Sequence, residues 1–253
     1  MQNKMENTKK LENRIKNYWG MRSSYFEKTR ENELLNSDIG NRWIETFNKY
    51  VSLEQTALNI LDIGTGAGYF AILLDHLGHR TTGIDLTPEM ISAANDLASK
   101  HHSNAHFLVM DAMHLDFPDN SFDAIVTRNL TWTLPDVPLA YREWFRVLKS
   151  GGVLINFDAN YGNNVRYEQN NPPVPSQDTP FDHQPLMDDM RKENAEITLS
   201  MEASRQNRPV WDLSILPSCG FSEFGADLNA GKKIMKEWDQ ITSPMFVVWA
   251  KKE

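Results

Sequence analysis

The sequence predicts an α/β fold in which a mostly parallel sheet is covered by helices on both faces. Between residues 58 and 152, short apolar runs of strand length alternate with stretches whose apolar residues recur at the spacing of a helix. Strands that alternate with helices are joined by crossovers, which place the strands parallel and the helices over the sheet. The 253 residues can bury one large core, and two independent domains are not expected.

The first fifty residues predict amphipathic helices that lie on a larger body. From about Leu11 the chain is polar and compatible with helix, and aromatic side chains such as Tyr18, Trp19 and Trp43 punctuate it. We therefore divide the chain into an N-terminal helical segment, residues 1–50, and a main domain, residues 51–253.

Five apolar runs predict strands, and three intervening segments predict helices. Gly78 stops the first helix, Thr87 and Pro88 suit the N-cap and first turn of the second, and the third is expected from about Val137 to Lys149. The strands are expected at residues 58–63, 81–85, 105–110, 122–127 and 151–158.

The alternation stops after Phe157. Five of the twelve prolines lie between Pro172 and Pro185, in a stretch that cannot continue a central strand. Residues 184–206 then predict one or two helices, and strand-like runs return at 220–228 and 244–252. We interpret residues from about 160 to 209 as an insertion that forms a cap.

Composition excludes several classes of partner. The net charge is -8 and the pI is about 5.4, so we expect neither nucleic acid nor a membrane surface as a partner. Cys219 is the only cysteine, and the seven histidines show no ligand spacing, so neither a disulfide nor a metal site is expected. No apolar stretch suits a signal peptide or a membrane span, and we expect a cytoplasmic protein.

The segment ILDIGTGAGYF, residues 60–70, places three glycines directly after a predicted strand. Such a bend brings backbone N–H groups and the positive end of a helix dipole to the sheet edge where ligands bind. Gly64, Gly66 and Gly68 fall one residue short of the dinucleotide pattern G-x-G-x-x-G. The carboxylate of Asp62 would repel a pyrophosphate and attract an ammonium group, so the bend predicts a cationic ligand.

This bend resembles the first motif of the class I S-adenosylmethionine-dependent methyltransferases. Three further segments agree in order: TTGIDLT, VMDAMHLDFPDNSFDAIV, and YREWFRVLKSGGVLI, in which Ser150 stands where proline is commoner. The resemblance covers residues 55–160 and the closing strands. It implies a Rossmann-like sheet of seven strands, mostly parallel, whose last strand near residues 244–252 is antiparallel, with an N-terminal helical lid and an inserted cap.

The resemblance implies S-adenosyl-L-methionine as the cofactor. Asp85 would hold the ribose hydroxyls, and Asp111 would accept from the adenine amine. Arg22 would meet the methionine carboxylate, while Trp19 or Tyr25 would face the sulfonium or methionyl chain; an ordinary amphipathic helix is the alternative for this segment. Further cofactor contacts are expected from Asp62, Gly64, Thr65, Gly66, Gly68, Leu86, Met90, Ala112, Arg128 and Asn129.

The acceptor is expected beyond the fourth strand, at TRNLTWTLPD. Many relatives carry a His pair where this chain has Trp132 and Thr133, so a histidine base cannot be assigned. Asn129, Thr131 and Trp132 would shape the acceptor pocket. The fifth strand would bring Asp158, Asn160 and Tyr161 to the same edge, with Asp158 orienting or deprotonating the acceptor or, alternatively, capping a turn. The predicted catalytic residues are Asn129, Trp132, Asp158 and Tyr161.

We predict transfer of a methyl group to a small-molecule acceptor by in-line displacement. Three alternatives stay open: methylation of a protein or tRNA, an NAD(P)-dependent oxidoreductase with an irregular glycine loop, and a cofactor-binding protein without catalysis. The accepting atom, which can be oxygen, nitrogen, sulfur or carbon, and the oligomeric state are also open.

Overall fold

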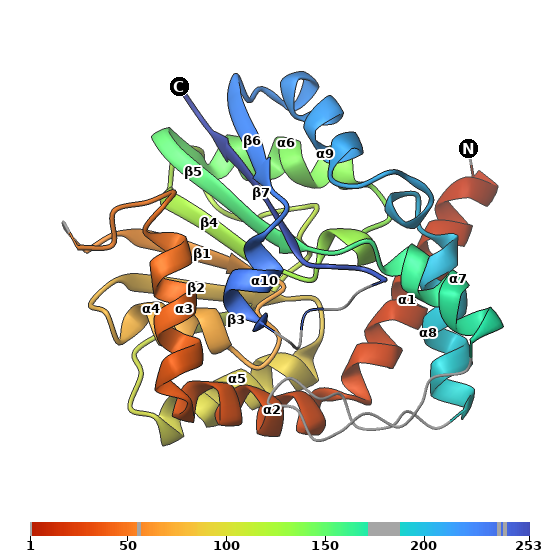
Figure 1. Ribbon diagram of the computed structural model, residues 1–253, viewed down its shortest axis with the longest axis horizontal. Coiled ribbons are helices and arrows are strands. Elements are labelled where there is room, and N and C mark those ends of the chain that lie inside the picture. The colour runs from red at the N-terminus through yellow and green to blue at the C-terminus, as the bar shows by residue number, and fades with distance from the viewer. Residues whose placement is uncertain (1, 55–56, 172–187, 237–238, 240–241) are drawn as a thin grey trace.

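The computed structural model describes residues 2–54, 57–171, 188–236, 239 and 242–253. A single central sheet of seven strands lies between helices (Figure 1). Its strands are β1 (Asn59–Ile63), β2 (Arg80–Asp85), β3 (His106–Val109), β4 (Phe122–Arg128), β5 (Leu148–Asp158), β6 (Glu223–Asp227) and β7 (Phe246–Lys251).

The strand order is β3-β2-β1-β4-β5-β7-β6. Neighbours from β3 to β5 pair in parallel, whereas β7 pairs antiparallel with both β5 and β6. This arrangement confirms the predicted α/β fold of seven strands, mostly parallel, with an antiparallel last strand.

Strand register brings the functional segments to one edge. Ile63 at the end of β1 pairs with Ile84 of β2 and Thr127 of β4. Arg128, the last residue of β4, pairs with Phe157 of β5. The carboxyl ends of four neighbouring strands therefore meet beside the glycine bend, as the crossover topology requires.

The helices are α1 (Gln2–Gly20), α2 (Ser23–Leu35), α3 (Ser37–Phe47), α4 (Tyr69–Asp75), α5 (Pro88–Lys100), α6 (Val137–Val147), α7 (Tyr161–Asn170), α8 (Asp188–Ser200), α9 (Val210–Ile215) and α10 (Ala230–Ile234). Short 3-10 turns occur at η1 (Thr131–Thr133), η2 (Ala203–Arg205) and η3 (Leu216–Cys219).

Three features of the helices differ from the sequence-based expectation: one boundary, one cap and one additional helix. The helix expected to reach Lys149 ends at Val147, because Leu148 is extended and already pairs with Phe122. Thr87 precedes α5 as expected but makes no side-chain cap; Asp85 accepts the Thr87 amide instead. The helix α7 was not predicted.

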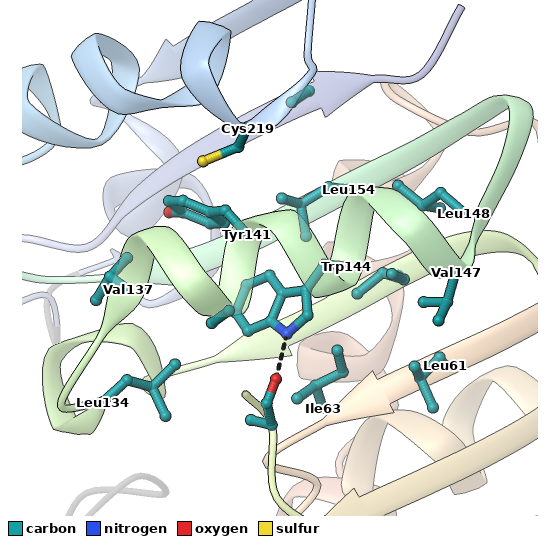
Figure 2. Packing of buried hydrophobic residues seen from close by; sticks show 14 of the residues in the cluster. Leu61, Ile63, Leu134, Val137, Tyr141, Trp144, Val147, Leu148, Leu154 and Cys219 are labelled. Carbon is teal, nitrogen blue, oxygen red and sulfur yellow. Dashed lines mark hydrogen bonds between the residues drawn. The ribbon is translucent and has the colours of Figure 1, made fainter. Parts of the chain in front are cut away.

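Alternate strand residues point to opposite faces and pack against different helices. Leu61, Ile63 and Leu154 join the core under α6, where the Trp144 indole nitrogen donates to the Ala112 carbonyl at 2.9 Å (Figure 2). On the other face, Ile60, Val126 and Ile155 pack with α3, α4 and α10. The predicted coverage of both faces is confirmed.

The N-terminal segment consists of two structurally different parts. Trp43 and Phe47 of α3 are fully buried against Phe70 and Phe157, so α3 belongs to the helical layer of the main core. In contrast, α1 packs against α8 of the inserted segment, beside α7 (Figure 1). The lid predicted for residues 1–50 stays a prediction, and α3 is not part of it, because it packs in the main core.

The inserted segment is described in part. The predicted helix at 184–206 corresponds to α8 and η2, whereas residues 172–187, which hold the five clustered prolines, lie outside the described residues. Arg14 of α1 forms ion pairs with Glu193 at 2.7 Å and Glu196 at 2.9 Å, which joins the N-terminal helix to this segment. Within the described part of the chain, no helix combines the length and apolar character needed to cross a membrane.

Candidate active site

A cavity of about 1070 Å³ opens at the carboxyl edge of the sheet, between the strand ends and helices α1, α2, α7 and α8. This volume lies at the upper end of the range of roughly 300–1,000 Å³ that is usual for ligand pockets. The predicted site residues that line the cavity are Trp19, Arg22, Asp62, Gly64, Thr65, Gly66, Asp85, Leu86, Met90, Asp111, Ala112, Arg128, Asn129, Trp132 and Tyr161.

The glycine bend forms part of the cavity wall. Gly66 has a φ of 53°, in the left-handed region, and a Cβ built there would meet no heavy atom within 4 Å. A ligand can therefore approach its backbone closely. Gly68 differs: its Cβ would lie 2.9 Å from the Phe107 ring, and Gly68 does not line the cavity. The lack of a side chain at Gly68 therefore allows close packing at the start of α4. The cavity lining does not support the cofactor contact that was predicted for Gly68.

The Asp62 carboxylate stabilises the glycine bend through hydrogen bonds. One oxygen, Oδ2, accepts from the Thr65 hydroxyl at 2.6 Å and from the Ala71 amide at 3.2 Å. Burial raises the pKa of the Asp62 carboxyl to about 7. Its charge at neutral pH therefore depends on what the cavity contains, and a bound ammonium group would favour the ionised form.

Asp85 connects the bend to the start of α5. Its carboxylate accepts from the Gly66 amide at 3.1 Å and from the Thr87 amide at 2.9 Å, and burial raises its pKa. A carboxylate offers about four lone-pair sites. The remaining sites can accept from a pair of hydroxyl groups in the cavity, as the prediction for the ribose requires.

Asp111 lies at the end of β3 with two local partners. It accepts from the Met113 amide at 2.9 Å and pairs with the His114 ring at 2.7 Å, and this hydrogen bond raises the pKa of His114. Glu12 of α1 also lines the cavity, and burial, followed by the charge of Asp111, raises its pKa. Glu12 was not predicted, because one carboxylate on a polar helix gives no signal in a single sequence.

Four described cavity-wall residues, Arg22, Tyr69, Arg128 and Asn129, have a buried polar side-chain atom without a partner among the described residues, which is rare in folded proteins, and two of them suit an amino-acid group. The Arg22 guanidinium is buried and donates through Nη1 to the Tyr18 hydroxyl at 3.0 Å, while its Nη2 has no partner. The Asn129 side-chain oxygen, Oδ1, is equally unpartnered. A free cationic donor and a free acceptor on one wall fit the carboxylate and ammonium of a methionyl group.

Tyr25 does not reach the cavity. Its ring packs edge-on against Phe26, with centroids 6.4 Å apart, and Tyr25 is not a lining residue. Trp19 does line it, so of the two aromatic residues predicted to face the methionyl chain the structure places only Trp19 there.

A buried ion network joins α2 to the central strand β4. The Glu33 carboxylate, fully buried, accepts two hydrogen bonds of 2.9 Å from Arg128 and one from Arg30. The Arg128 guanidinium also lies 4.8 Å from the centre of the Trp43 ring. Burial opposes ionisation of Glu33, but both arginines outweigh it and lower the pKa. Glu33 was not among the predicted site residues. A glutamate on a polar helix is expected to face water, and only the fold shows that Arg128 lies beside it.

An aromatic wall closes the far side of the cavity. The Trp132 ring lies 4.7 Å from that of Tyr161 on α7 and 6.1 Å from that of Trp19 on α1. The Trp132 indole donates to the carbonyl of Asn129, whose φ of 57° turns the chain sharply after β4. Burial raises the pKa of the Tyr161 hydroxyl, so it keeps its proton.

Asp158 does not lie in the cavity wall. Its side chain is fully buried and accepts from the Trp132 amide at 3.1 Å, the Ala159 amide at 2.8 Å and Arg208 at 3.0 Å. Asn160 likewise points away and donates to the Gln206 carbonyl at 3.1 Å. The structure therefore does not bring Asp158 into the cavity wall, and its carboxylate instead accepts from the backbone of Trp132 behind that wall.

Potential bases and metal ligands are restricted at this site. Among the described lining residues, none is histidine or cysteine. The described part of the chain also gathers no group of three or more histidine, cysteine, aspartate or glutamate side chains that could hold a metal ion.

We expect Glu33→Gln to lower the free energy of unfolding by about 3–5 kcal/mol, because two buried guanidinium groups would lose their carboxylate. Denaturant unfolding measures this loss. Glu31→Gln is the control. Glu31 lies on α2 like Glu33, and the loss of its more exposed ion pair with Lys100 should lower the free energy of unfolding much less. Equal losses in the two variants would contradict the structural role of Glu33.

The same network predicts a pH dependence. The pKa of Glu33 is lowered in the folded state from 4.5, so its stabilisation is complete above pH 4.5 and is lost as pH falls through the folded-state value. The stability difference between wild type and Glu33→Gln should therefore shrink in acid. A difference that stays constant from pH 7 downward through this range would show that Glu33 is not held ionised.

Residues 61–156 match the family model described as a methyltransferase domain. Over 102 residues the chain is 37% identical to 2-methyl-6-phytyl-1,4-hydroquinone methyltransferase of Synechocystis, which covers 40% of this chain and 32% of that protein. It is 35% identical over 107 residues to demethylmenaquinone methyltransferase of Thermus thermophilus, covering 42% and 49%. The chain thus spans a third to a half of the length of these curated relatives.

Solved structures share the fold. The phosphoethanolamine N-methyltransferase 2 of Haemonchus contortus, in complex with phosphomonomethylethanolamine and S-adenosylhomocysteine, has a TM-score of 0.58 at 17% identity, over 84% of this chain and 52% of that one. The YcgJ protein of Bacillus subtilis has a TM-score of 0.56 at 18% identity, over 86% and 100%. The segment 61–156 that matches the methyltransferase domain contains the glycine bend and the strand ends that wall the cavity, so the similarity to methyltransferases covers the part of the chain that forms the site.

Proposed function

We propose that this protein transfers a methyl group from S-adenosyl-L-methionine to a small-molecule acceptor. One observation carries the proposal: the cavity of about 1070 Å³ contains both the predicted cofactor residues and, beyond them, the aromatic wall of Trp19, Trp132 and Tyr161. Helices α1, α2, α7 and α8 surround this cavity, which suits a small molecule better than a polymer. The relatives named above as quinone and phosphoethanolamine methyltransferases support the same class of acceptor.

In this proposal the bend and the strand ends hold the cofactor. Asp85 accepts from the ribose hydroxyls, and Asp111 accepts from the adenine amine. Arg22 Nη2 binds the methionine carboxylate, while Asn129 Oδ1 and the ionised form of Asp62 face the ammonium. The bound cofactor supplies an electrophilic methyl group on a sulfonium.

Beyond the cofactor, the chain contributes mainly orientation and exclusion of water. The Trp132 face attracts a nearby cation, and Asn129, Trp132 and Tyr161 align the acceptor. Tyr161 acts as a hydrogen-bond donor, because its raised pKa keeps it protonated. Asp158, sealed behind Trp132, supports this wall and takes no proton from the acceptor. The net charge of -8 speaks against tRNA as the acceptor and, together with the small-molecule cavity, fits a cytoplasmic enzyme.

The test uses S-adenosyl-L-methionine that carries an isotopically labelled methyl group. The purified protein is incubated separately with the small-molecule, protein and RNA fractions of a cell extract, and mass spectrometry follows the label. We expect a labelled small molecule. Label only in the protein or RNA fraction would overturn the acceptor class, and label in no fraction would overturn methyl transfer.

Asp85→Ala should weaken binding of S-adenosylhomocysteine by roughly 1–3 kcal/mol, because the ribose hydroxyls lose their acceptor. Isothermal calorimetry measures the change. Asp96→Ala removes an exposed carboxylate from the neighbouring helix α5 and should leave the affinity unchanged. Identical affinities for the two variants would mean that the ribose binds elsewhere.

The raised pKa of Asp62 predicts that binding of the cofactor releases a proton. Because its pKa is about 7, part of the population is protonated at pH 7, and a bound ammonium group should expel that proton. Calorimetry of S-adenosyl-L-methionine binding at pH 7, in buffers of different ionisation enthalpy, should show proton release that Asp62→Asn abolishes. Unchanged release in Asp62→Asn would place the ammonium away from Asp62.

A further inference from the structure

A second buried ion network lies behind the aromatic wall and is centred on Arg208. The Arg208 side chain is 1% exposed, and its guanidinium donates to both oxygens of Asp212, at 2.9 and 2.8 Å. It also donates to Asp158 at 3.0 Å and to the Thr131 hydroxyl at 2.6 Å. Both carboxylates are fully buried, so one arginine joins three acceptors that water does not reach.

This network extends to the cavity wall through the carboxylate of Asp158. The oxygen of Asp158 that accepts from Arg208, Oδ2, also accepts from the Thr131 hydroxyl and from the Trp132 amide. The Trp132 ring forms the cavity wall against Tyr161. Arg208 itself does not line the cavity, so it acts on a ligand only through its neighbours, of which Asp158 is bonded to the cavity-wall residues Trp132 and Ala159.

The remaining partners fix the network in the sheet. The Tyr141 hydroxyl of α6 donates to Asp212 at 2.9 Å, and the Asn156 amide of β5 donates to Tyr141 at 3.0 Å and to Thr131 at 3.2 Å. The guanidinium must serve three acceptors in different directions at once. A planar fork with five donors can do this, whereas a lysine ammonium cannot reproduce the paired geometry.

We propose that Arg208 is a positioning residue for the acceptor side of the cavity, which orients Trp132 through Asp158 and Thr131. Arg208 lies at the end of the inserted segment, so it couples that end to the wall of the site. The assignment of an acceptor to this wall rests on the proposed methyl transfer. The mechanical link from Arg208 to Trp132 does not depend on it.

The test labels the seven tryptophans with fluorine and follows them by ¹⁹F NMR, with the Trp132 signal assigned through Trp132→Phe. Arg208→Lys keeps the charge but loses the fork, and we expect it to shift or broaden the Trp132 signal. The signal of Trp43, which lies in the core on the other face of the sheet, should stay in place. The affinity for S-adenosylhomocysteine should stay within about twofold, since Arg208 touches no cofactor residue at the bend.

Arg146→Lys is the matched control. Arg146 also makes several hydrogen bonds, to Glu143, Asp119 and two carbonyls, but it does not line the cavity or contact the network. We expect it to leave the Trp132 signal unchanged. If Arg208→Lys fails to fold, Asp158→Asn takes its place, because it keeps the side-chain volume while removing one acceptor oxygen, and it should shift the same signal.

The extract assay described above separates this inference from the proposed function. Arg208→Lys should form labelled product more slowly by about 10- to 100-fold, while Arg146→Lys should match the wild type. A Trp132 signal that stays in place in Arg208→Lys, or in Asp158→Asn where that variant is needed, would overturn the positioning role. Absence of product in every variant, with Trp132 still displaced, would overturn the proposed function and leave the link from Arg208 to Trp132 standing.

Discussion

The backbone bend after β1 is the constraint on which the site depends. Its three glycines have positive φ values, so the chain reverses at the sheet edge, where Gly64 and Gly66 line the cavity. Asp62 ties the bend to α4 through Thr65 and Ala71, and Asp85 ties it to α5. Two acidic residues with raised pKa values therefore lie where a cationic ligand is expected. The cavity begins where the central strand ends.

Two buried ion networks then hold the walls on either side of this bend. One joins the carboxylate of Glu33 to two arginines and fixes α2 against β4; the other joins Arg208 to two carboxylates and fixes the turn that carries Trp132. The first has one cation in excess and the second one anion in excess. Both networks act on the Tyr161 hydroxyl: the charge of Asp158 raises its pKa, and the charge of Arg128 lowers it. Such pairs are costly to bury, which favours a role in fixing geometry over a gain in stability.

The sequence was sufficient where the signal is local. The alternation of strands and helices follows from periodicity, and the strand order confirms it. The glycine bend and the acidic residues at strand ends were found from residues adjacent in the chain. Long-range contacts were not predictable: Glu33 lies 95 positions from Arg128, and Arg208 lies 50 positions from Asp158. The sequence predicted that Asp158 lies at this sheet edge, and it does. The direction of its side chain depends on its contact with the distant Arg208, which a position at a strand end does not reveal.

The most direct measurement is a crystal structure of the protein grown with S-adenosylhomocysteine. The ribose hydroxyls should lie against Asp85 and the adenine beside Asp111, with the amino-acid end between Arg22 and Asn129. The space beyond its sulfur should face Trp132 and Tyr161. A cavity without the ligand, or a ligand whose ribose lies away from Asp85, would contradict the assignment of this bend as the cofactor site.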